Sequence, residues 1–359
     1  MSISTKNIAI EKITNSRIGE VDFNNLTFGQ FFTDHMYECD FKNGEWQTPV
    51  IKPYGPIPMY PSAKVFHYGQ AVFEGMKAYK ADDDSIWMFR PDENQKRINI
   101  SSKRLQMPDF PEDLFFDGLE TLLKLDREWI KKGDGNSMYI RPFVIATENG
   151  VSASPSNEYK FMFLLSPAQS YFKSGSKGVK VLFANEYSRS ANGGVGFAKA
   201  AGNYAGQFYP THLAQEKGYQ QVVWTDANNH ENLEEAGVMN VFFRINDTLI
   251  TAPTSDRILD GVTRKSIIEV AKDEGIHVDI RKITVHEVEA AAKNNTLKEM
   301  FGTGTAAVIS PIIGFGYNNK DYDLPKQENS YADLLRKRIT DIQTNKAEDK
   351  FGWRYKVKE

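Results

Sequence analysis

Apolar and polar positions in the first half of the chain alternate in short runs around one longer helical pattern. The helix is expected to begin at Pro111 and to end at Gly133, because proline suits the first turn of a helix and glycine suits its end. Between these residues one face is apolar and comprises Leu114, Leu119, Leu122, Trp129 and Ile130. Strand patterns flank the helix at residues 76–79, 86–89, 137–146 and 159–165. Together these elements predict an α+β domain.

The second half of the chain has a mixed α/β pattern. Strands are expected at residues 179–184, 220–225, 238–245 and 248–252. Helices are expected at residues 204–217, 263–274 and 286–293. Residues 167–178 are rich in Gly, Ser and Pro and are interpreted as an interdomain connector, although Tyr171 and Phe172 are apolar for a plain linker. We therefore expect a smaller N-terminal domain at 1–166 and a larger C-terminal domain at 179–359.

Length and composition agree with two soluble domains. A chain of 359 residues exceeds one compact core, and 40% hydrophobic residues suffice to fill two. The net charge of -3 gives no general attraction for nucleic acid. The longest apolar runs, such as residues 161–165, are too short to span a bilayer. Neither nucleic acid nor a membrane is expected as a partner.

Cysteine usage and the N-terminal stretch indicate a cytoplasmic location. Cys39 is the only cysteine, so no intramolecular disulfide can form, which fits a reducing compartment. The N-terminal stretch carries Glu11, Glu20 and Asp22 without a continuous apolar core, which speaks against a signal peptide. A cytoplasmic enzyme is the simplest expectation.

Lys199 is the main candidate for chemistry, because it lies among small residues in the glycine-rich segment 192–204. A lysine amine with little bulk around it can form a Schiff base with an aldehyde cofactor. The segment lacks the spacing of the phosphate-binding motif G-x-x-x-x-G-K-[ST], and Lys199 stands where G-x-G-x-x-G needs its third glycine. On these residues alone, an ordinary surface loop with a solvated lysine remains the alternative.

Pyridoxal phosphate is the commonest lysine-bound aldehyde cofactor, and its pyridine ring needs an acidic partner. Glu235, just before the expected strand at 238–245, is the candidate, because a carboxylate keeps the ring nitrogen protonated. Glu231 and Glu234 lie close by, so a solvated acidic turn is the alternative interpretation.

The cofactor phosphate needs a cradle of donors. Val262 and Thr263 open an expected helix, and their amides would face an anion at its N-terminus. Thr305 adds a hydroxyl in a glycine-rich turn, and Arg97 can supply forked donors and positive charge. Taken singly, these features are equally typical of a helix cap, a turn and a surface arginine.

Seven segments in order resemble the branched-chain amino acid aminotransferases. They are residues 31–36, 73–79, 139–142, 192–204, 235–240, 261–264 and 302–306. The family belongs to fold type IV of the pyridoxal phosphate enzymes, with a two-domain, D-amino acid aminotransferase-like fold. The resemblance therefore implies that the larger C-terminal domain binds pyridoxal 5'-phosphate.

The resemblance also implies roles for the candidate residues. Lys199 would hold the cofactor and then carry the proton between the substrate Cα and cofactor C4′. Glu235 would pair with the pyridine nitrogen, and Tyr204 would hydrogen-bond the phenolic oxygen. The phosphate would be held by Arg97, Val262, Thr263 and Thr305. No metal is expected.

On the substrate side, the resemblance implies that Tyr139 and the amides near Thr305 and Ala306 receive the α-carboxylate. Arg141 would receive the distal carboxylate of glutamate, within an apolar pocket that also accepts an aliphatic side chain. The resemblance further implies that the walls of this pocket are Phe28, Tyr68, Phe73 and Tyr171. Val151 would reach the pocket across a dimer interface. For any one aromatic, ordinary core packing is the alternative.

The chain departs from vertebrate members of the family in two respects. Val238 stands where they carry a threonine, so a hydrogen bond from that hydroxyl is lost here. Their Cys-x-x-Cys redox switch would fall at residues 307–310, where both cysteines are absent. We expect no thiol regulation at the site.

The expected function is reversible transfer of an amino group between leucine, isoleucine or valine and 2-oxoglutarate. The enzyme would act as a homodimer by a ping-pong mechanism. Within the same fold, a D-amino acid transaminase or an aminodeoxychorismate lyase is the alternative. A non-catalytic binding module that has kept the fold is the alternative from another class.

Overall fold

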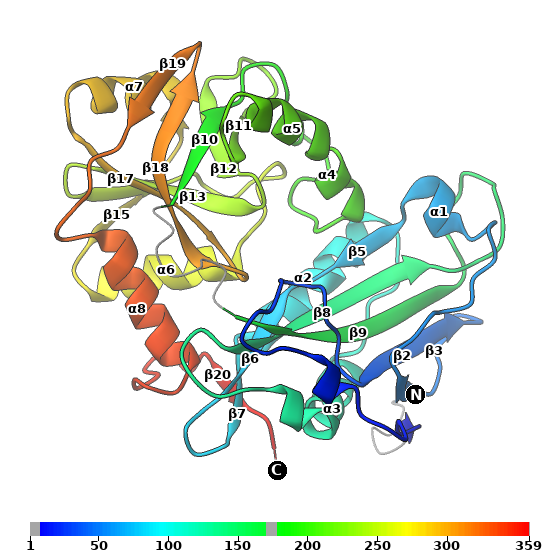
Figure 1. The fold of residues 1–359 in the computed structure, drawn as a ribbon. Helices are drawn as coiled ribbons and strands as arrows, with labels where there is room; N and C mark the ends of the chain where they lie inside the picture. Colours follow the sequence, from blue (N-terminus) through cyan, green and yellow to red (C-terminus); the bar gives the residue numbers. More distant parts are fainter. Residues whose placement is uncertain (1–7, 170–177, 359) are drawn as a thin grey trace. The chain divides into compact units, whose positions relative to one another are not determined.

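The computed structural model describes residues 8–169 and 178–358, which form two compact units (Figure 1). Of the described residues, the first unit holds 8–169, 198–201 and 342–358, and the second holds 178–197 and 202–341. This division differs from a single boundary at 167–178 in two places, because residues 198–201 and the C-terminal segment belong to the first unit. Residues 170–177 of the expected connector lie outside the described residues.

One mixed sheet forms the first unit. Its strand order is β1-β4-β2-β9-β8-β6-β7-β20, with β3 beside β2 and β5 beside β8. The strands are β1 Ala9–Ile10, β2 His35–Lys42, β3 Glu45–Trp46, β4 Val50–Pro53, β5 Ala71–Phe73, β6 Met76–Lys80, β7 Ile86–Phe89, β8 Ser137–Ala146, β9 Tyr159–Ala168 and β20 Arg354–Lys356. The antiparallel pairing of β20 with β7 is the reason that the C-terminal segment joins this unit.

Three helices and two 3-10 turns accompany this sheet. They are α1 Lys64–Tyr68, α2 Pro91–Arg104, α3 Glu112–Leu125, η1 Ile18–Glu20 and η2 Arg127–Trp129. The apolar core beside α3 includes stacked Phe110 and Phe161, whose ring centroids are 3.6 Å apart. This close-packed core holds α3 against the sheet that carries Phe73, Tyr139 and Arg141.

The helix expected from Pro111 to Gly133 is confirmed at its start and shorter at its end. Pro111 is the N-cap of α3, and the predicted apolar face is buried. The helix ends before Asp126, whose carboxylate accepts from the His35 backbone N–H at 3.0 Å and lies 2.6 Å from the His35 ring nitrogen Nδ1. This tertiary pair turns the chain into η2 and ends the helical repeat.

The second unit is built on a sheet that closes on itself. Its order is β15-β14-β13-β17-β18-β10-β11-β12-β16, and β12 also pairs with β13, while β19 flanks β18. The strands are β10 Val179–Phe183, β11 Gln221–Thr225, β12 Asn232–Ala236, β13 Met239–Ile245, β14 Thr248–Thr251, β15 His277–Ile280, β16 Ile283–Thr284, β17 Leu297–Gly304, β18 Val308–Tyr317 and β19 Lys320–Asp323. The β12–β13 pairing closes a ring of strands around an apolar core.

The helices of the C-terminal half are α4 Ala201–Ala205, α5 Phe208–Glu216, α6 Val262–Asp273, α7 Val285–Lys293 and α8 Tyr331–Gln343. The helix expected at 204–217 is divided into α4 and α5. Between them the Gln207 backbone N–H bonds to the Tyr204 carbonyl at 3.2 Å, and its side-chain Nε2 donates to the Asn203 carbonyl at 3.1 Å. Within the described part of the chain, no helix is both long and apolar enough to cross a membrane.

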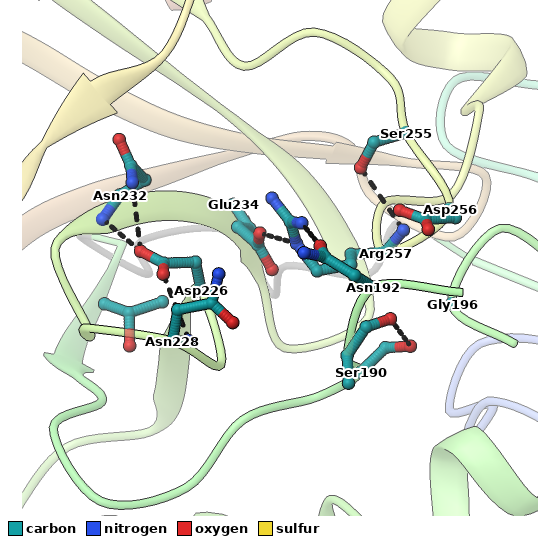
Figure 2. Close-up of polar contacts among 12 residues, drawn as sticks. Ser190, Asn192, Gly196, Asp226, Asn228, Asn232, Glu234, Ser255, Asp256 and Arg257 are labelled. Carbon is teal, nitrogen blue, oxygen red and sulfur yellow. Dashed lines mark hydrogen bonds and ion pairs between the residues drawn. The ribbon is translucent and has the colours of Figure 1, made fainter. Parts of the chain in front are cut away.

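Asp226 organises the turn from β11 to β12 (Figure 2). Its carboxylate accepts backbone N–H groups from Asn228, Asn229, Glu231 and Asn232, at 2.7 to 3.2 Å. Burial alone would raise the pKa of Asp226, but these donors hold that pKa well below its usual range. The turn that leads into β12 therefore depends on an ionised carboxylate.

Replacing Asp226 by Ala is expected to lower the free energy of unfolding by about 1–3 kcal/mol at pH 7, because four part-buried N–H groups lose a charged acceptor. The folded pKa is depressed, so this contribution is present above the unfolded pKa of about 3.9 and is lost as the pH falls toward the folded value. Urea unfolding of both proteins between pH 8 and pH 4 measures the difference. A difference that shrinks between pH 8 and pH 6 would contradict this account.

Candidate active site

Lys199 is held by its backbone on the first unit. The Phe73 N–H donates to the Lys199 carbonyl at 3.1 Å, and the Lys199 N–H donates to Ser101 Oγ at 2.8 Å. A β-bridge between Val72 and Ala200 continues this contact. These bonds explain why residues 198–201 group with the first unit, and they fix the backbone of Lys199 between β5 and α2.

Four of the predicted substrate residues gather near this lysine. Lys199 Nζ lies 4.9 Å from the centre of the Phe73 ring, and Arg141 Cζ lies 4.7 Å from the same centre. Arg141 Nη2 donates to the Tyr139 hydroxyl at 2.9 Å. Phe28 packs edge-on against Tyr139 with ring centroids 4.9 Å apart. The fold therefore places the side chains of Lys199 and Arg141 against aromatic faces, an arrangement that stabilises positive charge.

Arg97 is a buried residue in an ion pair, so the alternative of a surface arginine is wrong. Its Nε donates to Glu74 Oε1 at 2.6 Å and its Nη2 to Glu74 Oε2 at 2.8 Å. Asn94 Nδ2 also donates to Glu74 at 2.7 Å. Burial alone would raise the pKa of Glu74, but Arg97, Lys199 and Asn94 bring that pKa below its usual value.

Glu74, Asn94 and Ser101 contact the candidate residues or their partners, and sequence reasoning does not single them out. Asn94, Arg97 and Ser101 are spaced three and four residues apart and share one face of α2. That face contacts Glu74 and the Lys199 backbone. The helical spacing is a usable signal, but α2 has too polar a sequence to show an apolar stripe.

Glu235 lies on β12 of the second unit and is buried, so the alternative of a solvated acidic turn is wrong for this residue. Its Oε1 lies 2.7 Å from Arg189 Nη1, and the Leu259 N–H is 3.4 Å away. The neighbouring Glu234 pairs instead with Arg257 at 2.5 Å, and Arg257 also bonds to Asn192 (Figure 2). Adjacent strand residues point to opposite faces, so each carboxylate has its own arginine.

The start of α6 fits a phosphate group. The helix begins at Val262, followed by Thr263, and its N-cap is Gly261, which has no side chain to accept from the first amides. A Cβ at Gly261 would collide with Asn240 Oδ1, while Asn240 Nδ2 donates to the Leu259 carbonyl at 2.9 Å. Close packing against Asn240 thus keeps this helix end bare, as an anion site requires.

Thr305 and Ala306 lie in the turn of the β17–β18 hairpin. Val308, at the far side of this turn, has a φ of 59°, which is strained for a β-branched residue. The Thr303 hydroxyl, just before the turn, is buried and has no hydrogen-bond partner among the described residues. Backbone strain and an unsatisfied buried hydroxyl are typical of a binding site, so both features are consistent with a ligand at this hairpin.

The remaining predicted residues lie in several places. Tyr204 is half-buried on α4, and Val238 is exposed in the turn between β12 and β13. The Tyr68 hydroxyl donates to the carbonyl of Val151 within the same chain. Tyr171 lies outside the described residues. Within residues 8–169 and 178–358, no group of three or more His, Cys, Asp or Glu residues is placed to hold a metal.

Replacing Glu74 by Gln is expected to lower the free energy of unfolding by about 3–5 kcal/mol, because Arg97 would keep a buried charge without its counter-ion. The folded pKa of Glu74 is depressed, so its contribution is present above the unfolded pKa of about 4.3 and is lost at lower pH. Denaturant unfolding of the cofactor-free protein measures the change. The matched control is the double variant Glu74→Gln/Arg97→Met, which should recover part of the loss. A double variant less stable than the single one would contradict the pairing argument.

Comparison with known proteins identifies the family of this chain. A model of the amino-transferase class IV family matches residues 71–314. Branched-chain-amino-acid aminotransferase 2 of Bacillus subtilis (strain 168) is 42% identical over 355 residues, which are 98% of either chain. Branched-chain-amino-acid transaminase 1 of the same organism is 45% identical over 341 residues, 94% of this chain and 95% of the relative.

Solved structures show the same fold. The branched-chain aminotransferase of the thermophilic archaeon Thermoproteus uzoniensis, solved with norvaline, has a TM-score of 0.74 at 23% identity, covering 90% of this chain and 100% of that chain. The enzyme from Escherichia coli has a TM-score of 0.74 at 23% identity, covering 90% and 99%. Both are likenesses of fold, and the expected fold type IV architecture is confirmed. The chain belongs to the class IV aminotransferase family, whose enzymes use pyridoxal phosphate, and within it to the branched-chain-amino-acid aminotransferases.

Proposed function

We propose that this chain transfers the amino group reversibly between leucine, isoleucine or valine and 2-oxoglutarate by a ping-pong mechanism. The observation that carries the proposal is the cluster of Phe73, Tyr139 and Arg141 beside Lys199. One pocket must accept an aliphatic side chain in one half-reaction and a carboxylate in the other. A guanidinium that lies against aromatic rings serves both, because it offers charge without a strongly hydrated head.

Pyridoxal 5'-phosphate supplies an electron sink for the bond that breaks at the substrate Cα. Lys199 Nζ would bind the cofactor and then move the proton between Cα and C4′. Glu235 would hold the proton on the ring nitrogen, and Tyr204 would donate to the phenolic oxygen. The phosphate would be held by Arg97, Val262, Thr263 and Thr305. Support comes from the bare N-terminus of α6 and from the buried carboxylate of Glu235.

The bidentate pair with Glu74 gives Arg97 a specific part in this proposal. Its Nε and Nη2 point to Glu74, so the guanidinium has a fixed orientation before any anion arrives. Glu74 also offsets the positive charges of Arg97 and Lys199, and these two charges help to hold the pKa of Glu74 below its usual value.

On the substrate side, Tyr139 and the amides near Thr305 and Ala306 would receive the α-carboxylate, while Arg141 would receive the distal carboxylate of glutamate. The remaining pocket walls in the proposal are Phe28, Tyr68, Phe73, Tyr171, Val151 and Val238. Val238 can contact an aliphatic side chain but offers no hydroxyl, so we propose that this position contributes packing alone.

We further propose a homodimer in the cytoplasm. Tyr60, Phe66 and Val151 expose about two thirds of their surface, at 69%, 61% and 66%. They lie on two segments of the first unit that a β-bridge between Ala63 and Asn149 joins. An exposed apolar surface of this kind is typical of a subunit interface. Cys39 is a buried free thiol, which suits a reducing compartment.

Replacing Lys199 by Ala is expected to abolish the yellow absorbance of the bound cofactor and nearly all transamination, because the amine that lies against Phe73 and would form the imine is lost. Absorbance of the purified protein and turnover of leucine with 2-oxoglutarate measure this. Lys103→Ala, on an exposed part of α2, is the control and should keep both. Normal turnover by the Lys199 variant would overturn the assignment. Preferential turnover of D-alanine or aminodeoxychorismate by the unaltered protein would favour another enzyme of this fold.

Replacing Arg141 by Gln is expected to lower kcat/KM for glutamate by about 30-fold or more, because a buried charge pair with the distal carboxylate is lost. The effect on leucine should be several times smaller, since its side chain carries no charge. Steady-state kinetics with both amino acids measure the ratio, and Arg127→Gln on η2 is an exposed arginine control. Equal losses for glutamate and leucine would show that Arg141 does not select the distal carboxylate.

A further inference from the structure

Arg189 is a buried arginine beside the carboxylate of Glu235. Its Nη1 lies 2.7 Å from Glu235 Oε1, and the two side chains are only 3% and 4% exposed. Burying an arginine is costly unless its donors are used and its charge is matched. The position of Arg189 therefore needs a reason beyond simple packing.

The guanidinium of Arg189 is fixed by the backbone around it. Nη1 donates to the carbonyls of Gly196 and Arg257, each at 2.9 Å. A Cβ at Gly196 would collide with the Arg257 carbonyl, so glycine is required where these two backbones meet. The Gly193 N–H also bonds to the carboxylate of Asp256, which holds the glycine-rich segment on the same turn. Arg189 is thus rigidly placed toward Glu235.

A second arginine in the same region makes an informative comparison. Glu234 is buried next to Glu235 and pairs with Arg257 at 2.5 Å. Burial raises the pKa of Glu234 even so, although Arg257 and Arg189 oppose the rise, and nearby Asp226 adds to it. On this strand, burial thus outweighs even an arginine at hydrogen-bond distance. Arg189 gives the equally buried Glu235 a positive charge at 2.7 Å, as Arg257 does for Glu234.

The consequence concerns a proton shared between Glu235 and a basic nitrogen. Such a pair can exist as carboxylate and protonated nitrogen or as carboxylic acid and neutral nitrogen. A positive charge 2.7 Å from the carboxylate stabilises the first form, because it is closer to the oxygen than to the nitrogen beyond it. Only the first form makes the ring an effective electron sink.

We infer that Arg189 is a positioning residue for Glu235, which keeps this carboxylate ionised and aimed so that the cofactor ring nitrogen stays protonated. This inference rests on the proposed function. Arg189 acts through Glu235, and its own contacts are with that carboxylate and with two backbone carbonyls.

The experiment uses the full chain reconstituted with pyridoxal phosphate labelled with 15N in its ring. Arg189→Met, Glu235→Gln and the double variant are compared with the unaltered protein by the 15N chemical shift at one pH. We expect the unaltered protein in the pyridinium range and both single variants moved toward neutral pyridine. The double variant should show no change beyond Glu235→Gln. kcat should fall by about tenfold or more in Arg189→Met, as expected for one unit of proton affinity.

Two controls separate this effect from general damage. Arg257→Met removes the partner of Glu234 and should leave the 15N shift in the pyridinium range. Arg189→Lys keeps a positive charge and should retain that shift even where the backbone contacts are weakened. If Arg189→Met does not fold, a neutral nitrogen in the folded Arg189→Lys protein would overturn the inference.

The outcomes distinguish the inference from the proposed function. A pyridinium signal in Arg189→Met together with its loss in Glu235→Gln would overturn the inference and leave the function intact. An unaltered protein that binds no pyridoxal phosphate would overturn the function itself.

Discussion

Pairing of buried carboxylates with arginine is the constraint on which both units depend. A carboxylate removed from water costs several kcal/mol unless a counter-ion and hydrogen-bond donors replace the solvent. Glu74 meets this need with Arg97 in the first unit, and Glu235 meets it with Arg189 in the second. The partners come from distant parts of the chain, so each pair also fixes which segments lie together. The ion pairs that stabilise each unit are thus also the ones that orient the candidate site residues.

The sequence predicts the fold best where the pattern is local. Strands β6, β7, β8 and β10 lie within one residue of the expected ranges, because their apolar runs are bounded by turns. Strand β12 is not expected from the sequence, since Asn232 to Ala236 contains two glutamates and has no apolar alternation. Its strand character comes from β11 and β13 on either side and from arginines that neutralise its acids. Those are tertiary effects that propensity does not contain.

The residues of the candidate site also differ in whether the sequence can identify them. Lys199, Glu235 and the α6 N-terminus can be found because each residue type suits one chemical task. Glu74, Arg189 and Asn240 cannot, because their role is to hold another residue in place. Asn240 illustrates this: it pairs in register with Glu235, bonds to the Leu259 carbonyl and leaves no room for a side chain at Gly261. The sequence shows which residue stands at such a position, but only the fold shows which residue it contacts.

The glycines before Lys199 can be understood from their contacts. Glycine allows a backbone to adopt positive φ values and to pass close to other groups. Gly193 has a φ of 70°, and Gly196 lies too close to the Arg257 carbonyl for any side chain. Both therefore serve a tightly held backbone, since the Asp256 carboxylate and the Arg189 guanidinium bind the same stretch. Three residues after Gly196, the Lys199 backbone is bonded to Phe73 and Ser101 in the first unit. These two bonds fix the backbone of Lys199. Movement of its amine between cofactor and substrate must therefore come from the side chain, whose four methylene groups allow it.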